Sequence, residues 1–116
     1  MHQIMRLPNS DYASVPAEKL RDYLLSPFHP VGRFKARFFN ALGYYSDEWP
    51  LLERDIRTLL GGDAAKTEKT SYGQKYEVFG TITGPSGRTA QIVTVWIVIH
   101  GERIPRFVTA YPGGGT

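Results

Sequence analysis

The densest group of side chains that could act together chemically lies in the sequence HPVGRFKAR, which begins at His29. Three cations, Arg33, Lys35 and Arg37, follow the histidine, and the segment has the features of a helix start. The free N–H groups and the positive dipole at such a helix end attract phosphate, and arginine binds phosphate through paired donors. Gly32 would let a ligand approach the backbone closely. The segment therefore predicts an anion site.

A structural role for the same segment is the alternative interpretation. In that case His29 caps the helix, and the cations form a solvated face beside an amphipathic stripe. Both interpretations are compatible with the sequence.

A second candidate site combines aromatic and hydroxyl side chains in the C-terminal part of the chain. Trp96, His100, Thr109 and Tyr111 are spaced so that one open face of a predicted sheet would carry them. Aromatic rings stack on unpaired bases and hydroxyls contact phosphate, so this face predicts RNA binding. The alternatives are that Trp96 packs in the core and that His100, next to Gly101 in a turn, has only a surface role.

Several other classes of site are excluded or disfavoured. The chain has no cysteine, which excludes disulfides, thiolate catalysis and sulfur-ligated metals. His2, His29 and His100 are far apart, and no HExxH motif, carboxylate cluster or glycine-rich nucleotide loop occurs. We therefore expect no metal and no other cofactor. Ser86 lies in a hairpin turn without an evident base, so a serine hydrolase is disfavoured.

The overall composition is that of a small globular protein with a mild preference for anionic partners. The 116 residues suffice for one domain, predicted over 1–116 with a flexible tail at 112–116. The net charge of +3 and the pI near 9.3 favour acidic partners such as RNA. No signal peptide and no apolar run of ~18 residues occurs. We expect a soluble cytoplasmic protein without membrane contact, with delivery inside a larger toxin as the alternative.

Helical periodicity dominates the first half of the chain. Pro16 fits the first turn of a helix, the residue before Pro30 is biased against helical angles, and Ser46 is a suitable cap. The apolar spacing predicts helices at about 16–25, 31–43 and 47–60. The buried stripe expected on the second helix contains Phe34, Phe38, Ala41 and Leu42.

Alternation with a period of two replaces the helical period in the second half. A polar connection is expected at 61–73, and strands are predicted at about 74–83, 88–99 and 104–111. The aliphatic residues of the middle strand should face the helices; they are Val93, Val95, Ile97 and Ile99. Trp96 would then lie on the open face with Thr109 and Tyr111. The predicted class is α+β, with the N-terminal helices packed on one face of a C-terminal antiparallel sheet of three or four strands.

Two blocks of the sequence resemble a bacterial domain family of unknown function. They are an LPN start at Leu7 and an HPxGRxKAxFF-like block at His29, and the likeness continues through YEVFGTITGPSGR and PRFVTAYP. Members of that family occur alone and at the ends of polymorphic toxin or phage-related proteins. The resemblance implies a cognate immunity or antitoxin protein as a partner.

The order of helices followed by strands, ending in VTAYP, also resembles the barnase–EndoU–colicin–RelE superfamily of metal-independent ribonucleases. That resemblance implies RNA as substrate and nominates His29, Arg33, Thr109 and Tyr111 as catalytic residues. Such an enzyme removes a proton from a 2′-hydroxyl, stabilises a phosphorane and protonates the departing 5′-oxygen. The expected substrate-binding residues are Lys35, Arg37, Trp96 and His100. No second histidine is evident to complete an acid–base pair.

Two further functions fit the same sequence. A non-catalytic adaptor that binds RNA or protein would use the basic patch without an acid–base set. An immunity-type partner of a toxin would depend on its surface rather than on a cleft, although a blocker of a basic nuclease is usually acidic and this chain is basic.

Overall fold

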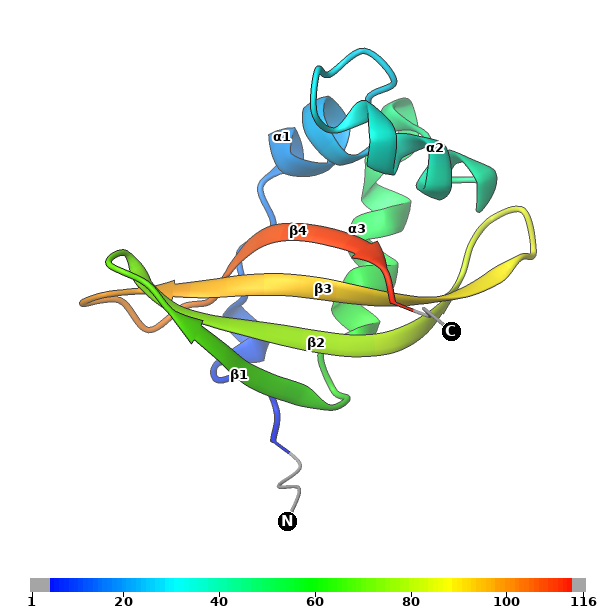
Figure 1. The fold of residues 1–116 in the computed structure, drawn as a ribbon. Coiled ribbons are helices and arrows are strands. Elements are labelled where there is room, and N and C mark those ends of the chain that lie inside the picture. The colour runs from blue at the N-terminus through cyan, green and yellow to red at the C-terminus, as the bar shows by residue number, and fades with distance from the viewer. Residues whose placement is uncertain (1–4, 114–116) are drawn as a thin grey trace.

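The structure of the chain is a computed structural model, and it describes residues 5–113. Helices occupy the first half and a four-stranded antiparallel sheet the second, which confirms the predicted α+β class. Figure 1 shows α3 crossing behind the strands, with α1 and α2 beyond β4. The helical elements are η1 (Ser10–Tyr12), α1 (Ala17–Lys19), η2 (Leu20–Leu24), α2 (Arg33–Ala41), η3 (Ser46–Glu48) and α3 (Trp49–Leu59). The strands are β1 (Ala64–Lys69), β2 (Gly73–Thr83), β3 (Thr89–Ile99) and β4 (Arg106–Pro112).

The first predicted helix is present but changes its winding part-way. Pro16 caps α1, and the chain then continues as the π-helical segment η2, in which the Leu25 N–H donates to the Leu20 carbonyl. Leu20, Leu24 and Leu25 are all fully buried. Single π-helical turns often occur near functional sites, and Tyr23 lies within this one.

The buried face of α2 differs from the predicted stripe. Ala36 and Phe39 are fully buried, whereas the side chain of Phe34 is 69% exposed. The helix begins at Arg33 rather than at residue 31. It packs through the face that carries Ala36 and Phe39, because α2 contacts η2 and Phe39 belongs to the hydrophobic core. Phe34 therefore points to solvent, which corrects its assignment to the core.

The sheet contains one strand more than the alternation predicted. β1 lies inside 61–73, which was expected to be a polar connection, and pairs with β2 from Ala64 opposite Val78 to Lys69 opposite Gln74. As an edge strand it has mostly exposed polar side chains, so its sequence lacks the apolar alternation of a strand.

The faces of β3 are the reverse of those predicted. Ile92, Thr94 and Trp96 lie in the core that packs against the helices, and all three are at most 1% exposed. The Trp96 indole N–H donates to the Thr94 hydroxyl at 2.8 Å, and that hydroxyl donates to the Val78 carbonyl at 3.2 Å. The side chains of Val93 and Val95 consequently point to the opposite face of the sheet. Because the buried indole has a local acceptor, tryptophan can occupy the core at little polar cost.

A β-bulge in β4 decides which of its residues share a face. Thr109 pairs with Val95, but Phe107 pairs with the next residue, Trp96, so Val108 is an extra residue in the strand. Phe107 lies in the core against Trp96, with ring centroids 5.3 Å apart. Thr109 and Tyr111 therefore remain on the side of Val95, whereas Phe107 lies on the opposite side of the strand.

The LPN segment and the C-terminal residues have structural roles. Leu7 is buried, and Asn9 adopts a left-handed conformation (φ 54°) while its side chain donates to the Arg103 carbonyl at 2.9 Å. At the other end, Pro112 belongs to β4 and the Gly113 N–H donates to the backbone carbonyl of Gln91. The remainder of the predicted tail, 114–116, lies outside the described residues, as does His2.

Candidate functional site

The side chain of Lys35 connects the helical layer to the sheet. Its ammonium donates to the Tyr23 hydroxyl at 3.2 Å and to the Thr109 hydroxyl at 3.0 Å. The three side chains come from α2, η2 and β4, and all three are half-buried, so solvent or a ligand can reach the group. An ammonium has three donors, of which two are used here. One N–H and the positive charge remain for an anion.

This arrangement lowers the pKa of the Tyr23 hydroxyl. Burial alone would raise the pKa, but hydrogen bonding to Lys35 and Thr109 and the positive charges of Lys35 and Lys19 outweigh it. A phenol with a lowered pKa releases its proton more readily than an ordinary tyrosine.

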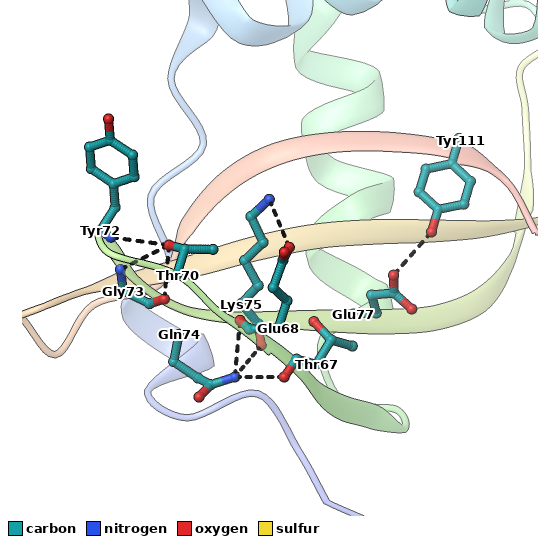
Figure 2. Close-up of polar contacts among 9 residues, drawn as sticks. All are labelled: Thr67, Glu68, Thr70, Tyr72, Gly73, Gln74, Lys75, Glu77 and Tyr111. Carbon is teal, nitrogen blue, oxygen red and sulfur yellow. Dashed lines mark hydrogen bonds and ion pairs between the residues drawn. The ribbon is translucent and has the colours of Figure 1, made fainter.

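Tyr111 lies on the same face of the sheet as Thr109 and holds a carboxylate. Its hydroxyl donates to the Glu77 carboxylate at 3.1 Å, across β3 (Figure 2). Burial and the negative charge of Glu77 raise the pKa of Tyr111. Glu77 pairs with Val95, which pairs with Thr109. Two strand spacings of ~4.8 Å therefore put the Glu77 and Thr109 backbones about 10 Å apart, with both side chains on the sheet face opposite the one that carries Trp96.

His29 has the capping geometry that we considered as the alternative to a ligand-binding role. Its Nδ1 accepts the N–H groups of Val31 and Gly32 at 3.0 and 2.9 Å, and its ring packs edge-on against Tyr23 with centroids 4.9 Å apart. The Arg33 N–H donates to the His29 carbonyl. These bonds occupy the helix-end donors that the predicted anion site would have used.

Gly32 has a role in packing rather than the predicted role of letting a ligand approach the backbone. A Cβ at this position would lie 2.0 Å from the carbonyl oxygen of Tyr23. Glycine is needed because the start of α2 presses directly on the backbone of η2. The close approach is thus between two parts of the chain.

The remaining predicted site residues lie away from Lys35. Arg33 and Arg37 line a shallow cavity of about 190 Å³ on the outer side of α2. His100 packs at the β1–β2 turn, where its Nε2 lies 3.2 Å from the Thr70 carbonyl. Figure 2 shows Thr70 bonded within that turn, at the opposite end of the sheet from Tyr111. Trp96 is fully buried in the core, so its predicted stacking on a base is wrong.

The described part of the chain contains neither a cluster of metal ligands nor a membrane-spanning helix. Within residues 5–113, no three His, Cys, Asp or Glu side chains gather as metal ligands would. No helix in that range has the length and apolar character to span a bilayer.

The sequence matches a family model over almost its whole length. Residues 6–114 match the family described as Domain of unknown function (DUF6883). The chain belongs to this family. The resemblance to a family of unknown function is thereby confirmed at that level. No curated protein matches the sequence of this DUF6883 member.

A solved structure has a similar fold. It is described as a contact-dependent growth inhibition toxin – immunity protein complex from Klebsiella pneumoniae 342. The TM-score is 0.68 at 20% sequence identity, and the alignment covers 91% of the DUF6883 chain and 97% of the other chain. At this identity the comparison supports the fold alone.

Two residues of the cluster were not among the predicted site residues. They are Tyr23, which lies in the predicted first helix, and Glu77, which lies in the first predicted strand. Glu77 gave no distinct signal in the sequence, because a polar residue between Tyr76 and Val78 is the usual alternation of a half-buried strand. Tyr23 gave none either, because its partners Lys35 and Thr109 are 12 and 86 positions further along the chain.

Proposed function

We propose that this DUF6883 chain is a toxin-type ribonuclease that needs no metal and cleaves RNA through attack of a 2′-hydroxyl. The observation that supports the proposal most is the Lys35 ammonium, held by Tyr23 and Thr109 beside the sheet face that carries Glu77 and Tyr111. This set supplies a cation, a carboxylate and a phenol of lowered pKa around one accessible surface.

In the proposed reaction Glu77 is the general base. Its carboxylate takes the proton of the ribose 2′-hydroxyl, and the 2′-oxygen forms a bond to phosphorus. The P–O5′ bond then breaks, leaving a 2′,3′-cyclic phosphate on one product and a 5′-hydroxyl on the other. Tyr111 is a positioning residue, because its hydrogen bond holds the carboxylate on the open face.

Lys35 stabilises the charge that develops on the phosphorane oxygens. Its remaining N–H donor and its charge act on the oxyanion, and the Thr109 hydroxyl holds the ammonium in place. Tyr23 is the general acid and gives its proton to the departing 5′-oxygen. The lowered pKa of Tyr23 suits this role, because a stronger acid transfers its proton earlier in bond cleavage.

Of the residues predicted from the sequence, Lys35 still contacts the phosphate, Thr109 and Tyr111 stay in the site as positioning residues, and the role of His29 changes. With Nδ1 bonded to two backbone amides, the imidazole holds the start of α2 and supports the Tyr23 ring. We therefore assign His29 a positioning role. The acid–base pair that seemed to lack a second histidine consists of Glu77 and Tyr23.

The toxin reading is preferred over the immunity reading. The similar structure contains both a toxin and an immunity protein by its description, so either side of such a pair has to be considered. This chain carries a net charge of +3, and a protein that binds RNA benefits from positive charge, whereas an inhibitor of a basic nuclease is usually acidic. Growth inhibition when the chain is expressed in bacteria would support the toxin side.

The direct test is cleavage of total tRNA by the purified chain in the presence of EDTA. We expect cyclic-phosphate products from the wild-type protein. Lys35→Ala should reduce the cleavage rate by roughly 10²–10³-fold, the usual effect of removing one oxyanion donor, and Glu77→Gln by roughly 10²–10⁴-fold. Lys66→Ala, which removes an exposed lysine on β1, is the matched control and should cleave normally.

The proposal fails if the wild-type chain leaves tRNA intact, or if Lys35→Ala and Lys66→Ala cleave equally well. RNA binding without any turnover would instead support the adaptor function.

A further inference from the structure

The outer side of α2 and the loop before it expose a group of apolar side chains. Phe28 is 89% exposed, Phe34 69% and Val31 59%. Scattered exposed apolar residues are ordinary, but a contiguous group of them marks an interaction site. The cavity lined by Arg33, Phe34 and Arg37 shares Pro27 and Asn40 with a second cavity lined by Phe28, so the two adjoin. We call Phe28, Arg33, Phe34 and Arg37 the α2 outer patch.

The two arginines of the patch give it a specific chemistry. The Arg33 guanidinium lies over the Phe34 ring, 4.6 Å from its centroid. No ion pair within residues 5–113 includes Arg33 or Arg37. A guanidinium stacked on an aromatic ring still presents its N–H donors to an anion. Exposed rings beside cations are the combination that binds single-stranded nucleic acid, through base stacking and phosphate contacts.

The position of the patch relative to Lys35 favours RNA over a protein partner. Arg33 and Arg37 lie one turn apart on α2, and Lys35 points from the opposite flank to Tyr23 and Thr109. A strand that passes around a helix of about 10–12 Å diameter from one flank to the other covers about 16–19 Å, which corresponds to roughly five stacked nucleotides at ~3.4 Å each. A strand with its scissile phosphate at Lys35 can therefore reach the patch with the nucleotides that flank it.

The charges around the patch also define where such a strand ends. The second cavity continues from Pro27 and Asn40 to Asp47 and Glu48. Their carboxylates would repel phosphates, so the strand should stop at Arg37 rather than continue along η3.

We infer that the α2 outer patch binds the nucleotides flanking the cleavage site of a single-stranded RNA segment, with bases stacked on Phe34 and Phe28 and phosphates at Arg33 and Arg37. This inference rests on the proposed function for its choice of substrate. The patch contributes to the affinity for RNA, whereas Lys35, Tyr23 and Glu77 carry out the proposed chemical step.

The test is fluorescence anisotropy of a labelled 2′-O-methyl oligoribonucleotide of loop sequence with the full chain. This probe cannot be cleaved, because its attacking hydroxyl is methylated, so binding is measured apart from catalysis. We expect Phe34→Ala to weaken binding roughly tenfold, the usual loss for one stacked base. Arg37→Ala should reduce the slope of log affinity against log salt by about one between about 50 and 200 mM.

Matched controls lie elsewhere on the surface. Tyr72→Ala removes an aromatic ring that is 75% exposed at the β1–β2 turn, and Arg54→Ala removes an exposed arginine on α3. Both should bind as the wild type does. Phe34→Leu keeps an apolar side chain without a stacking surface and should weaken binding as Phe34→Ala does, which separates stacking from apolar contact.

The outcomes distinguish this inference from the proposed function. If oligonucleotide binding depends on Phe34 and Arg37 but the chain does not cleave tRNA, the RNA-binding role of the patch is supported and the proposed ribonuclease function is refuted. If the wild-type chain cleaves tRNA but Phe34→Ala binds the oligonucleotide as tightly as Tyr72→Ala does, the proposed ribonuclease function stands and the inference about the patch is overturned. The inference about the patch is also overturned if the wild-type chain shows no salt-dependent binding to the oligonucleotide. That result is expected if the patch contacts a protein instead of RNA.

Discussion

Tyr44 ties the helical layer to the sheet, and its hydroxyl offers a quantitative test of the packing. The side chain is fully buried, and the residue lies in the segment that connects α2 to η3 and α3. Its hydroxyl donates to the Asp55 carboxylate and lies 3.3 Å from the Thr83 carbonyl of β2. The perturbation is Tyr44→Phe, which removes the hydroxyl and keeps the ring.

The expected loss of stability follows from the partners of the hydroxyl. A hydrogen bond to a charged group contributes about 1.5–3 kcal/mol. The Asp55 side chain retains its bond to Arg54 and is 18% exposed, so it does not become an isolated buried charge. The cost should therefore fall in the lower part of that range, about 1.5–2 kcal/mol. For a chain of this length it corresponds to a decrease in Tm of roughly 5–10 °C.

The pH dependence has a defined sign. Burial, and then the hydrogen bond and negative charge of Asp55, raise the pKa of the Tyr44 hydroxyl well above its usual value. A group whose pKa is higher in the folded state contributes its full stabilisation below the unfolded pKa of about 10. That contribution is lost as the pH rises from there through the folded pKa.

Urea unfolding of the two proteins, followed by tryptophan fluorescence, measures the effect. The difference in free energy of unfolding between wild type and Tyr44→Phe should be constant from about pH 6 to 9 and should shrink above about pH 10. A difference below about 0.5 kcal/mol at neutral pH, or one that grows above pH 10, would refute this account of the Tyr44 contacts.

Three more predictions concern the site and the core. Lys35→Met should raise the pKa of Tyr23, because it removes the bond and charge that outweigh burial; a tyrosinate absorbance titration showing no upward change contradicts this. Gly32→Ala should destabilise the fold by roughly 1–3 kcal/mol or more through its clash with the Tyr23 carbonyl, whereas Gly61→Ala, which meets nothing within 4 Å, should melt near the wild-type temperature. Thr94→Val should cost about 1–3 kcal/mol, because the neighbouring buried indole N–H loses its acceptor; an unchanged urea midpoint would argue against that bond.

The fold class could be predicted because its signals are local. Apolar residues at helical spacing in 47–60 and the GPSG turn between two alternating segments act through their nearest neighbours, and both appear in the structure as α3 and the β2–β3 hairpin. Gly43, expected at the end of the second helix, adopts φ 99° just after α2.

The faces of the elements were harder to predict, since more than one assignment satisfied the pattern. Both sides of β3 are rich in apolar side chains, so alternation alone could not choose between the Val95 face and the Trp96 face. The indole was assigned to the open side, but its N–H finds an acceptor in Thr94 and the large ring fills the core. The bulge at Val108 has no sequence signal comparable to a glycine turn.

What the sequence determined by itself is the order and type of the elements, the basic character of 29–37 and the capacity of His29 to cap a helix. Only the tertiary structure decided that Lys35, rather than Arg33 or Arg37, meets Thr109 and Tyr23, and that Glu77 meets Tyr111 on the same face of the sheet as Thr109. The physical reason is that helix rotation and strand register are chosen by packing over the whole core. A change of one residue in either would turn these side chains to another face.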